Sequence, residues 1–329
     1  MKYICCVLLS FLYIHTASAQ FEPAAGHIGS TAVYQDSTVI MQWAKSCKLQ
    51  RGYMNIANPS SGYASVGDEN APIGKAGTNG VASLGDGGSA VLTFDLPVAN
   101  GEGFDFAVFE NGFEEVGDTL DFLEYAFVEV SSDGIQYVRF PSRYVGDTSN
   151  QVTSFQATNT RLYHNLAGKY TAGFGTPFDL EELKNEPGLD VDHVTHVKIV
   201  DVVGSMTLAY ATRDQEGRKV NDPWPTEFSS SGFDLDAVGV IHLGAPLGIS
   251  SNTFPFETKI YPNPATEALH IVSYAEQVKV EMKNLIGKTV LENEFAFSRT
   301  LDVSAFSPGI YMLDITANTL KFSKKVLIQ

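Results

Sequence analysis

Residues 125–140 read Tyr-Ala-Phe-Val-Glu-Val-Ser-Ser-Asp-Gly-Ile-Gln-Tyr-Val-Arg-Phe, and this stretch decides the class of fold. Two runs rich in β-branched and aromatic residues, 125–131 and 135–140, flank the turn sequence Ser132-Asp133-Gly134. Residues of these kinds favour extended backbone, and the Asp-Gly pair favours a tight reversal of the chain. The stretch therefore predicts a β-hairpin.

Short segments of similar character lie on both sides of this hairpin. We predict further strands over 89–96, 104–110, 194–203 and 232–243. One modest helix pattern covers 178–185, where Asp179 suits the N-cap and Pro187-Gly188 ends the helix. Many short strands with Gly-rich turns and little helix predict an all-β protein, a jelly-roll-like β-sandwich.

The first residues have the pattern of an export signal. Lys2 supplies a positive charge, residues 4–14 form an apolar run, and Ala17-Ser18-Ala19 are the small residues that a signal peptidase accepts. Residues 1–19 are therefore predicted to be a signal peptide. The apolar run is short for a bilayer, and no later run is longer, so we predict no transmembrane segment.

The charge is distributed unevenly along the chain. Residues 20–254 contain 30 acidic and 13 basic side chains, whereas residues 255–329 contain 8 of each. An acidic surface repels nucleic acid and anionic membranes, so neither is an expected partner. Divalent cations and neutral or basic ligands are favoured instead.

Cys47 is the only cysteine beyond the predicted signal peptide. An exported protein with one cysteine has no internal disulfide, so its stability must come from a buried core, with a bound metal as a further source. We interpret Cys47 as a small core residue rather than as a nucleophile.

The composition changes near residue 245. Residues 245–257 mix Pro, Gly, Ser and Asn without periodicity and predict a linker between an acidic domain, 20–244, and a C-terminal domain, 258–329. Alternating runs at roughly ten-residue spacing predict that the C-terminal domain is a small Ig-like β-sandwich. Its expected strands are 268–274, 278–284, 289–295, 299–303, 310–316 and 321–328.

Five motifs follow one another in order within 258–329. They are Ile260-Tyr261-Pro262-Asn263-Pro264-Ala265, Asn284-Leu285-Ile286-Gly287-Lys288, Leu301-Asp302-Val303-Ser304, Pro308-Gly309-Ile310-Tyr311 and Lys324-Lys325-Val326-Leu327. Together they resemble the type A C-terminal sorting domain of the type IX secretion system of Bacteroidetes. The resemblance implies the type IX secretion machinery as a partner, passage through the periplasm and across the outer membrane, and then release or attachment to a surface glycolipid.

The acidic domain carries weaker motifs. They are Ala82–Gly88, Phe104–Gly112, Val128–Gly134, Gly175–Leu180 and Gly232–Val238. These segments resemble bacterial cell-surface β-sandwich proteins of the galactose-binding-like type. That resemblance implies a fold and a location more than a chemistry, because the fold hosts many kinds of binding. For some members it also implies a role beside an outer-membrane transporter in corrinoid uptake.

Acidic side chains at two predicted strand ends suggest a metal site. Asp234 and Asp236 are two apart, so in a regular strand both project from one face, while Glu110 and Asn111 end another strand. Oxygen ligands of this kind suit Ca²⁺. We predict a structural Ca²⁺ held by Glu110, Asn111, Asp234 and Asp236. The alternative is that the two aspartates accept backbone N–H bonds.

A second acidic group follows Asn111. It consists of Glu114, Glu115, Asp118, Asp121 and Glu124. Its spacing lacks the alternation and the fixed glycine of an EF-hand loop. We interpret it as a solvated loop, with weak cation binding as the alternative.

The ligand contacts are predicted at aromatic residues in loops. Trp224 follows Asp222 in a proline-stiffened loop, and Tyr63 lies in a loop of similar composition. Trp224, Asp222 and Tyr63 are therefore the candidate ligand-binding residues, because a rigid aromatic ring loses little entropy on binding. The indole of Trp224 fits equally well as a plug of the core.

The sequence leaves several functions open. A module that captures a glycan or another small ligand requires the fewest assumptions. A corrinoid-capture accessory of an outer-membrane transporter, a carbohydrate hydrolase that uses Glu110 and Asp236, and a structural adhesin are the alternatives. Neither G-x-S-x-G nor H-E-x-x-H occurs in the chain, and we assign no catalytic residue.

Overall fold

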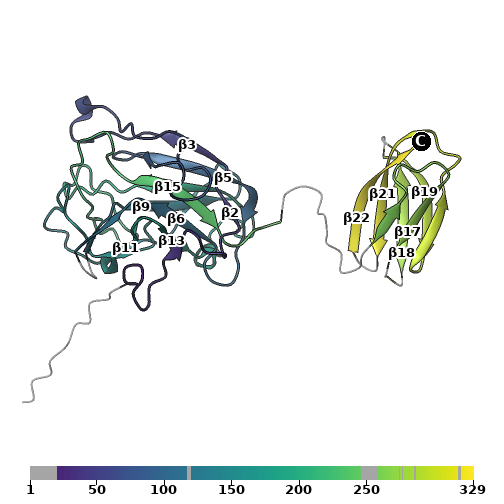
Figure 1. The fold of residues 1–329 in the computed structure, drawn as a ribbon, viewed down its shortest axis with the longest axis horizontal. Helices are drawn as coiled ribbons and strands as arrows, with labels where there is room; N and C mark the ends of the chain where they lie inside the picture. The colour runs from purple at the N-terminus through teal and green to yellow at the C-terminus, as the bar shows by residue number, and fades with distance from the viewer. Residues whose placement is uncertain are drawn as a thin grey trace, which may run out of the picture. The chain divides into compact units, whose positions relative to one another are not determined.

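The computed structural model describes residues 21–116, 120–245, 258–273, 275, 277–284, 287–317 and 320–329. The chain divides at Gly244 into two compact units, each built from strands (Figure 1). The predicted signal peptide, 1–19, and residues 246–257 of the predicted linker lie outside the described residues.

One sheet of the N-terminal unit has six strands. They are β1 (Val33–Tyr34), β13 (Phe174–Phe178), β6 (Phe106–Glu110), β15 (Asp234–Val240) and β2 (Gln42–Trp43) in that spatial order, with β4 (Ala82–Ser83) also paired to β15. All of these pairings are antiparallel. Strands β6 and β15 are central and every one of their residues is buried, which explains their nearly continuous apolar sequences.

The other sheet has five strands. In spatial order they are β10 (Val138–Arg139), β9 (Ala126–Ser131), β14 (Val194–Asp201), β5 (Ser89–Val98) and β3 (Ser46–Gln50). The predicted hairpin forms, since Val138 pairs with Val130 and Arg139 with Glu129. In its turn, the Asp133 carboxylate accepts hydrogen bonds from the backbone N–H groups of Ile135 and Gln136 at 2.8 and 2.9 Å.

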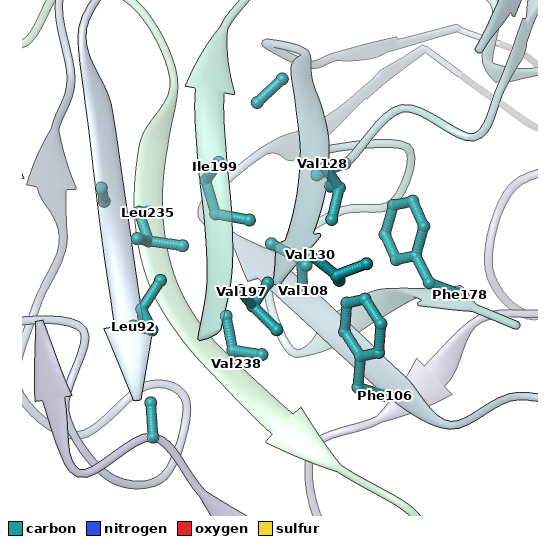
Figure 2. Close-up of a cluster of buried hydrophobic side chains, with 14 of the residues drawn as sticks. Leu92, Phe106, Val108, Val128, Val130, Phe178, Val197, Ile199, Leu235 and Val238 are labelled. Atoms are coloured by element: carbon teal, nitrogen blue, oxygen red, sulfur yellow. The ribbon is translucent and has the colours of Figure 1, made fainter. Parts of the chain in front are cut away.

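The apolar faces of the two sheets pack together to form the core (Figure 2). The labelled side chains come from both sheets: Leu92, Val128, Val130, Val197 and Ile199 from one, and Phe106, Val108, Phe178, Leu235 and Val238 from the other. Each is at most 1 % exposed. A fully buried side chain of this size contributes about 1.5–3 kcal/mol, so this layer stabilises the sandwich. The predicted all-β, jelly-roll-like sandwich is confirmed.

The expected helix at 178–185 is much shorter. Phe178 belongs to β13, and only Leu180–Leu183 form a turn of 3₁₀-helix. The Asp179 carboxylate caps it as predicted, accepting from the N–H of Glu181 at 2.9 Å. Two short ribbons, β7 (Phe113–Val116) with β8 (Leu120–Phe122) and β11 (Arg143–Tyr144) with β12 (Tyr163–His164), complete the unit.

The C-terminal unit has a three-stranded and a four-stranded antiparallel sheet with their own core. The first contains β16 (Lys259–Tyr261), β17 (Ala268–Val272) and β20 (Ser298–Asp302), and the second contains β19 (Thr289–Phe295), β18 (Val278–Lys283), β21 (Gly309–Ala317) and β22 (Leu320–Ile328). All six strands that the sequence predicts here are present. Residues from both sheets are fully buried, among them Ile271, Val280 and Leu313.

Asn263 connects the start of the C-terminal unit to its last strand. Its Nδ2 donates to the carbonyl of Lys325 at 3.0 Å, and its Oδ1 accepts from the N–H of Leu327 at 2.9 Å. We expect Asn263→Ala to destabilise this unit by about 1–2 kcal/mol, because two hydrogen bonds are lost. Asn263→Asp keeps the acceptor alone and should lose less. Urea unfolding of both variants measures this, and equal losses would contradict the assignment.

Candidate functional site

Three loops of the N-terminal unit meet at one place: 53–66, 151–156 and 221–231. The backbone N–H of Ser65 donates to the carbonyl of Ser229 at 2.8 Å, and that of Trp224 donates to the carbonyl of Val152 at 3.0 Å. These bonds join the 221–231 loop to both of its neighbours.

Glu227 ties two of these loops together by its side chain. Its Oε2 accepts from Nδ2 of Asn55 at 3.0 Å, and its Oε1 accepts from Nδ2 of Asn58 at 2.9 Å. Hydrogen bonds to a charged acceptor are among the stronger ones in proteins. The loops are therefore held in one arrangement rather than moving independently.

Four aromatic side chains from the same loops form two stacked pairs, and all but Tyr53 are exposed. The rings of Tyr53 and Tyr63 stack with centroids 4.7 Å apart, and those of Phe155 and Phe228 stack at 5.7 Å. Tyr63 is 56 % exposed, Phe155 73 % and Phe228 36 %. We call the surface formed by Tyr53, Tyr63, Phe155, Glu227 and Phe228 the aromatic loop surface.

Trp224 lies half-buried in the same loop as this surface. Its Nε1 donates to Oδ2 of Asp86 at 3.0 Å, and the same oxygen accepts from the N–H of Ile56 at 2.9 Å. The indole therefore anchors the loop to the body of the unit. Asp222 lies deeper still and is only 2 % exposed, so the structure places it inside the unit rather than on an open surface.

Six buried carboxylates lie in this part of the unit, and we call them the carboxylate cluster. The exposed fractions are 4 % for Asp86, 2 % for Glu110, 5 % for Glu124, 1 % for Asp201, 2 % for Asp222 and 7 % for Asp234. Within the described residues, no lysine or arginine forms an ion pair with any of them, although the charge of Arg51 lowers the pKa of Asp234 slightly against the effect of burial. Such an accumulation of buried negative charge is unfavourable unless protons or a cation offset it.

Backbone and side-chain donors satisfy part of the cluster. Asp201 accepts from the N–H groups of Phe233 and Gly87 at 2.8 and 3.0 Å. Glu110 accepts from the N–H of Gly112 at 2.7 Å. Asp234 accepts from Oγ of Ser83 and from Nδ2 of Asn111, the latter at 3.2 Å.

The pKa values of the cluster are raised. Burial is the main cause throughout, and it brings the pKa of Asp201 to about 8, with the charge of Asp86 adding to the effect. Burial raises the pKa of Asp234 to about 6. For Glu110, burial and then the charge of Asp234 raise the pKa well above its ordinary value.

The four predicted metal ligands are only partly brought together. Asn111 contacts Asp234, and Leu235 in β15 pairs with Glu110 in β6. The register of β15 shifts between Leu235 and Ala237, so the simple alternation expected for Asp234 and Asp236 is interrupted there. Asp236 instead accepts from the N–H of Gly77 at 3.0 and 2.9 Å, which is the alternative that the sequence left open.

Asp86 and Asp201 complete the cluster, and neither of them was singled out from the sequence as a site residue. Glu124 was expected in a solvated loop but is buried, and so is Asp121, at 5 % exposed. Asp118 lies outside the described residues. Throughout the part of the chain that the structure describes, no three His, Cys, Asp or Glu side chains are already arranged to hold a metal ion.

Two chemical roles find little support in the geometry. Glu110 and Asp236, the pair considered for glycoside hydrolysis, are 2 % and 6 % exposed, and both are bonded to backbone N–H groups. Neither carboxylate therefore faces an open substrate site. Burial raises the pKa of the Cys47 thiol to about 12, which suits a core residue and disfavours a nucleophile.

A comparison with protein families identifies the C-terminal unit. The family described as "Secretion system C-terminal sorting domain" matches residues 259–329. These residues are a type IX sorting domain. The sorting domain directs the protein through the type IX secretion system, so the protein acts at the cell surface or outside the cell. No helix long and apolar enough to cross a membrane occurs among the described residues ahead of or within the sorting domain.

Comparisons with curated sequences and with solved structures do not assign a function to the N-terminal unit. No curated protein sequence matches the chain. One solved structure is described as "Crystal structure of putative beta-galactosidase from bacteroides fragilis". It is 10 % identical, covers 87 % of this chain and has a TM-score of 0.18, and this chain spans 40 % of its length. That likeness carries no argument about activity.

Proposed function

We propose that the N-terminal unit is a ligand-capture module that binds a neutral glycan on the aromatic loop surface outside the cell. The observation that carries this proposal is the two stacked ring pairs, Tyr53 with Tyr63 and Phe155 with Phe228, on loops that are tied to one another. All of these rings except the half-buried Tyr53 are exposed. Large apolar side chains grouped at an exposed site mark interaction surfaces more often than scattered ones do.

The chemistry of the surface suits sugars. A sugar ring presents C–H groups on its faces and hydroxyl groups around its edge. The exposed rings of Tyr63 and Phe155 offer flat apolar faces on which the C–H groups of a sugar can pack. The carboxylate of Glu227 and the exposed side chain of Asn58 lie on the same loops and can accept from or donate to the hydroxyls.

The loops are held in place before a ligand arrives. Glu227 bonds to both Asn55 and Asn58, and Trp224 bonds to Asp86 beneath the surface. A site that needs no ordering on binding loses less entropy. The net negative charge of residues 20–254 disfavours anionic glycans, so we expect a neutral or basic one.

An open hollow elsewhere on the unit is less suited to this role. It has a volume of about 560 Å³ and is lined by Gly67, Asp68, Asn70, Ala71, Ile73 and Asn79. Its lining contains no aromatic side chain. It offers polar contacts but no flat apolar face for a sugar ring.

The test is a binding screen of residues 20–329 against neutral glycans and cobalamin, followed by calorimetry on the best ligand. Tyr63→Ala and Phe155→Ala should each weaken binding by about 3- to 10-fold, the effect of losing one aromatic contact. Ile135→Ala is the matched control, because Ile135 is 82 % exposed but lies in the β9–β10 turn. Equal losses in all three variants would contradict the proposed surface. Binding of cobalamin without any glycan would instead support corrinoid capture beside an outer-membrane transporter.

A further inference from the structure

Two members of the carboxylate cluster lack the partners that buried carboxylates normally have. Oδ1 of Asp222 is fully buried and accepts no hydrogen bond. Its Oδ2 has one long contact, 3.4 Å from the N–H of Tyr125. The Glu124 carboxylate is also buried, at 5 % exposed, and no lysine or arginine among the described residues forms an ion pair with it. Buried polar atoms without partners are rare in folded proteins and call for an explanation.

The backbone brings Glu110, Glu124 and Asp222 close together. The contact between Asp222 and the N–H of Tyr125 places Asp222 beside Glu124, which immediately precedes Tyr125. Gly112, two residues after Glu110, packs so tightly on 122–123 that an added Cβ would lie 2.7 Å from Cδ2 of Leu123. Three separate segments that each carry a buried carboxylate therefore lie side by side.

We propose that Glu110, Glu124 and Asp222 bind a Ca²⁺ ion in the interior of the N-terminal unit. A divalent cation supplies the missing partner of Asp222 and a positive charge for three carboxylates that form no ion pair with a lysine or arginine of the described residues. The donors are all oxygens, without a histidine or a thiolate, and such a set selects Ca²⁺ over Zn²⁺. In Asp201 and Asp234 both carboxylate oxygens already accept hydrogen bonds, so these residues surround the ion rather than coordinate it.

The three carboxylates must draw closer to form a complete coordination sphere. Like charges without a cation repel, and the flexible side chains of Glu110 and Glu124 allow this movement. Backbone carbonyls and waters supply the remaining oxygens that Ca²⁺ accepts in its six- to eight-fold coordination. This ligand set differs from the one predicted from the sequence, because both oxygens of Asp236 accept from the N–H of Gly77 and both oxygens of Asp234 accept from Ser83 and Asn111. It does not depend on the identity of any ligand of the aromatic loop surface.

The test uses residues 20–329, stripped of metal with a chelator and titrated with CaCl₂ by calorimetry. We expect one bound Ca²⁺ per chain and a higher melting temperature in Ca²⁺. Tb³⁺ provides an independent probe, because Tyr125 adjoins the site and should sensitise its luminescence. The isosteric variants Asp222→Asn and Glu124→Gln should each weaken Ca²⁺ binding by about tenfold or more. Asp95→Asn, an exposed carboxylate of the same unit, is the control and should bind normally.

A second readout separates metal binding from mere stability. Without metal, Glu124→Gln should raise the melting temperature, because it removes an uncompensated buried charge. The same variant should lose most of the rise that Ca²⁺ causes in the wild type. An unchanged wild-type melting temperature at millimolar Ca²⁺, with no Tb³⁺ luminescence, would overturn the proposal and leave protons as the partners of these carboxylates. Equal binding of Mg²⁺ would overturn the assignment of Ca²⁺.

Discussion

A chain that ends at residue 257 should accumulate in the periplasm, whereas the full chain should appear at the cell surface or in the medium. The reason is that residues 259–329 are the sorting domain that the type IX machinery recognises. The strands of this domain form a separate core, so its removal does not expose the core of the N-terminal unit. Immunoblots of periplasmic, outer-membrane and medium fractions from the native bacterium measure the effect, which we expect to be nearly complete.

Two further chains make this result specific. A chain in which 246–257 is replaced by a Gly/Ser linker of equal length should still be exported, because the sorting domain is intact. Fusing 258–329 to an unrelated periplasmic protein that carries its own signal peptide should send that protein outside. Normal surface display of the truncated chain would show that another segment carries the sorting signal.

The sequence predicts the strands well because each depends on local pattern. The hairpin at 125–140 forms because its apolar runs face the core and its Asp133-Gly134 turn is bonded internally. In the sorting domain, Asn263 was visible only as part of a motif, and the structure gives its physical role in binding the last strand. The helix predicted at 178–185 was too long. Phe178 belongs to strand β13, and only a short 3₁₀ turn, Leu180–Leu183, follows it.

The carboxylate cluster could be predicted only in part. Glu110 and Asp234 were visible at strand ends, but the bulge in β15 that redirects Asp236 leaves no clear mark in the sequence. Glu124 had one usable signal, because both of its neighbours, Leu123 and Tyr125, are apolar and are now seen to be fully buried. A single acidic residue within an apolar run is costly to bury, so its position indicates a candidate site residue.

The aromatic loop surface could also be predicted only in part from the sequence. Tyr63 and the loop of Trp224 were recognised from their Pro, Asn and Gly content. Phe155 and Phe228 were missed, because their stacking depends on two loops that are 73 positions apart in sequence. No local pattern specifies such a contact, which arises only when the sandwich places both loops at the same place.

The first described residues of the chain are fixed by a partly buried ion pair. The Glu22 carboxylate contacts the ammonium of Lys169, whose side chain is 3 % exposed, and the Phe21 ring stacks on His164 with centroids 4.8 Å apart. Burial lowers the pKa of Lys169, and Glu22 opposes this effect. An ammonium in such a place is tolerated because the carboxylate is beside it.

The pair predicts how stability changes in acid. His164 and Lys169 hold the pKa of Glu22 well below its ordinary value of 4.5. The unfolded carboxyl therefore binds a proton before the folded one does as the pH falls. The stabilisation that Glu22 provides is complete above about pH 4.5 and is lost progressively below it.

Replacing Glu22 by alanine should destabilise the N-terminal unit by about 3 kcal/mol, because the buried ammonium of Lys169 loses its counter-charge. This is the lower end for a broken buried pair, since Glu22 itself is 32 % exposed. The double variant Glu22→Gln/Lys169→Met should recover most of the loss, because it leaves no unpaired charge. Urea unfolding at pH 7 and pH 3.5 measures both effects, and Glu22→Gln should weaken the acid-induced loss seen in the wild type. Asp95→Ala is the control: it breaks an exposed pair with Lys45 and should cost about 0.5 kcal/mol or less. Equal losses in Glu22→Ala and Asp95→Ala would show that Lys169 does not need its partner.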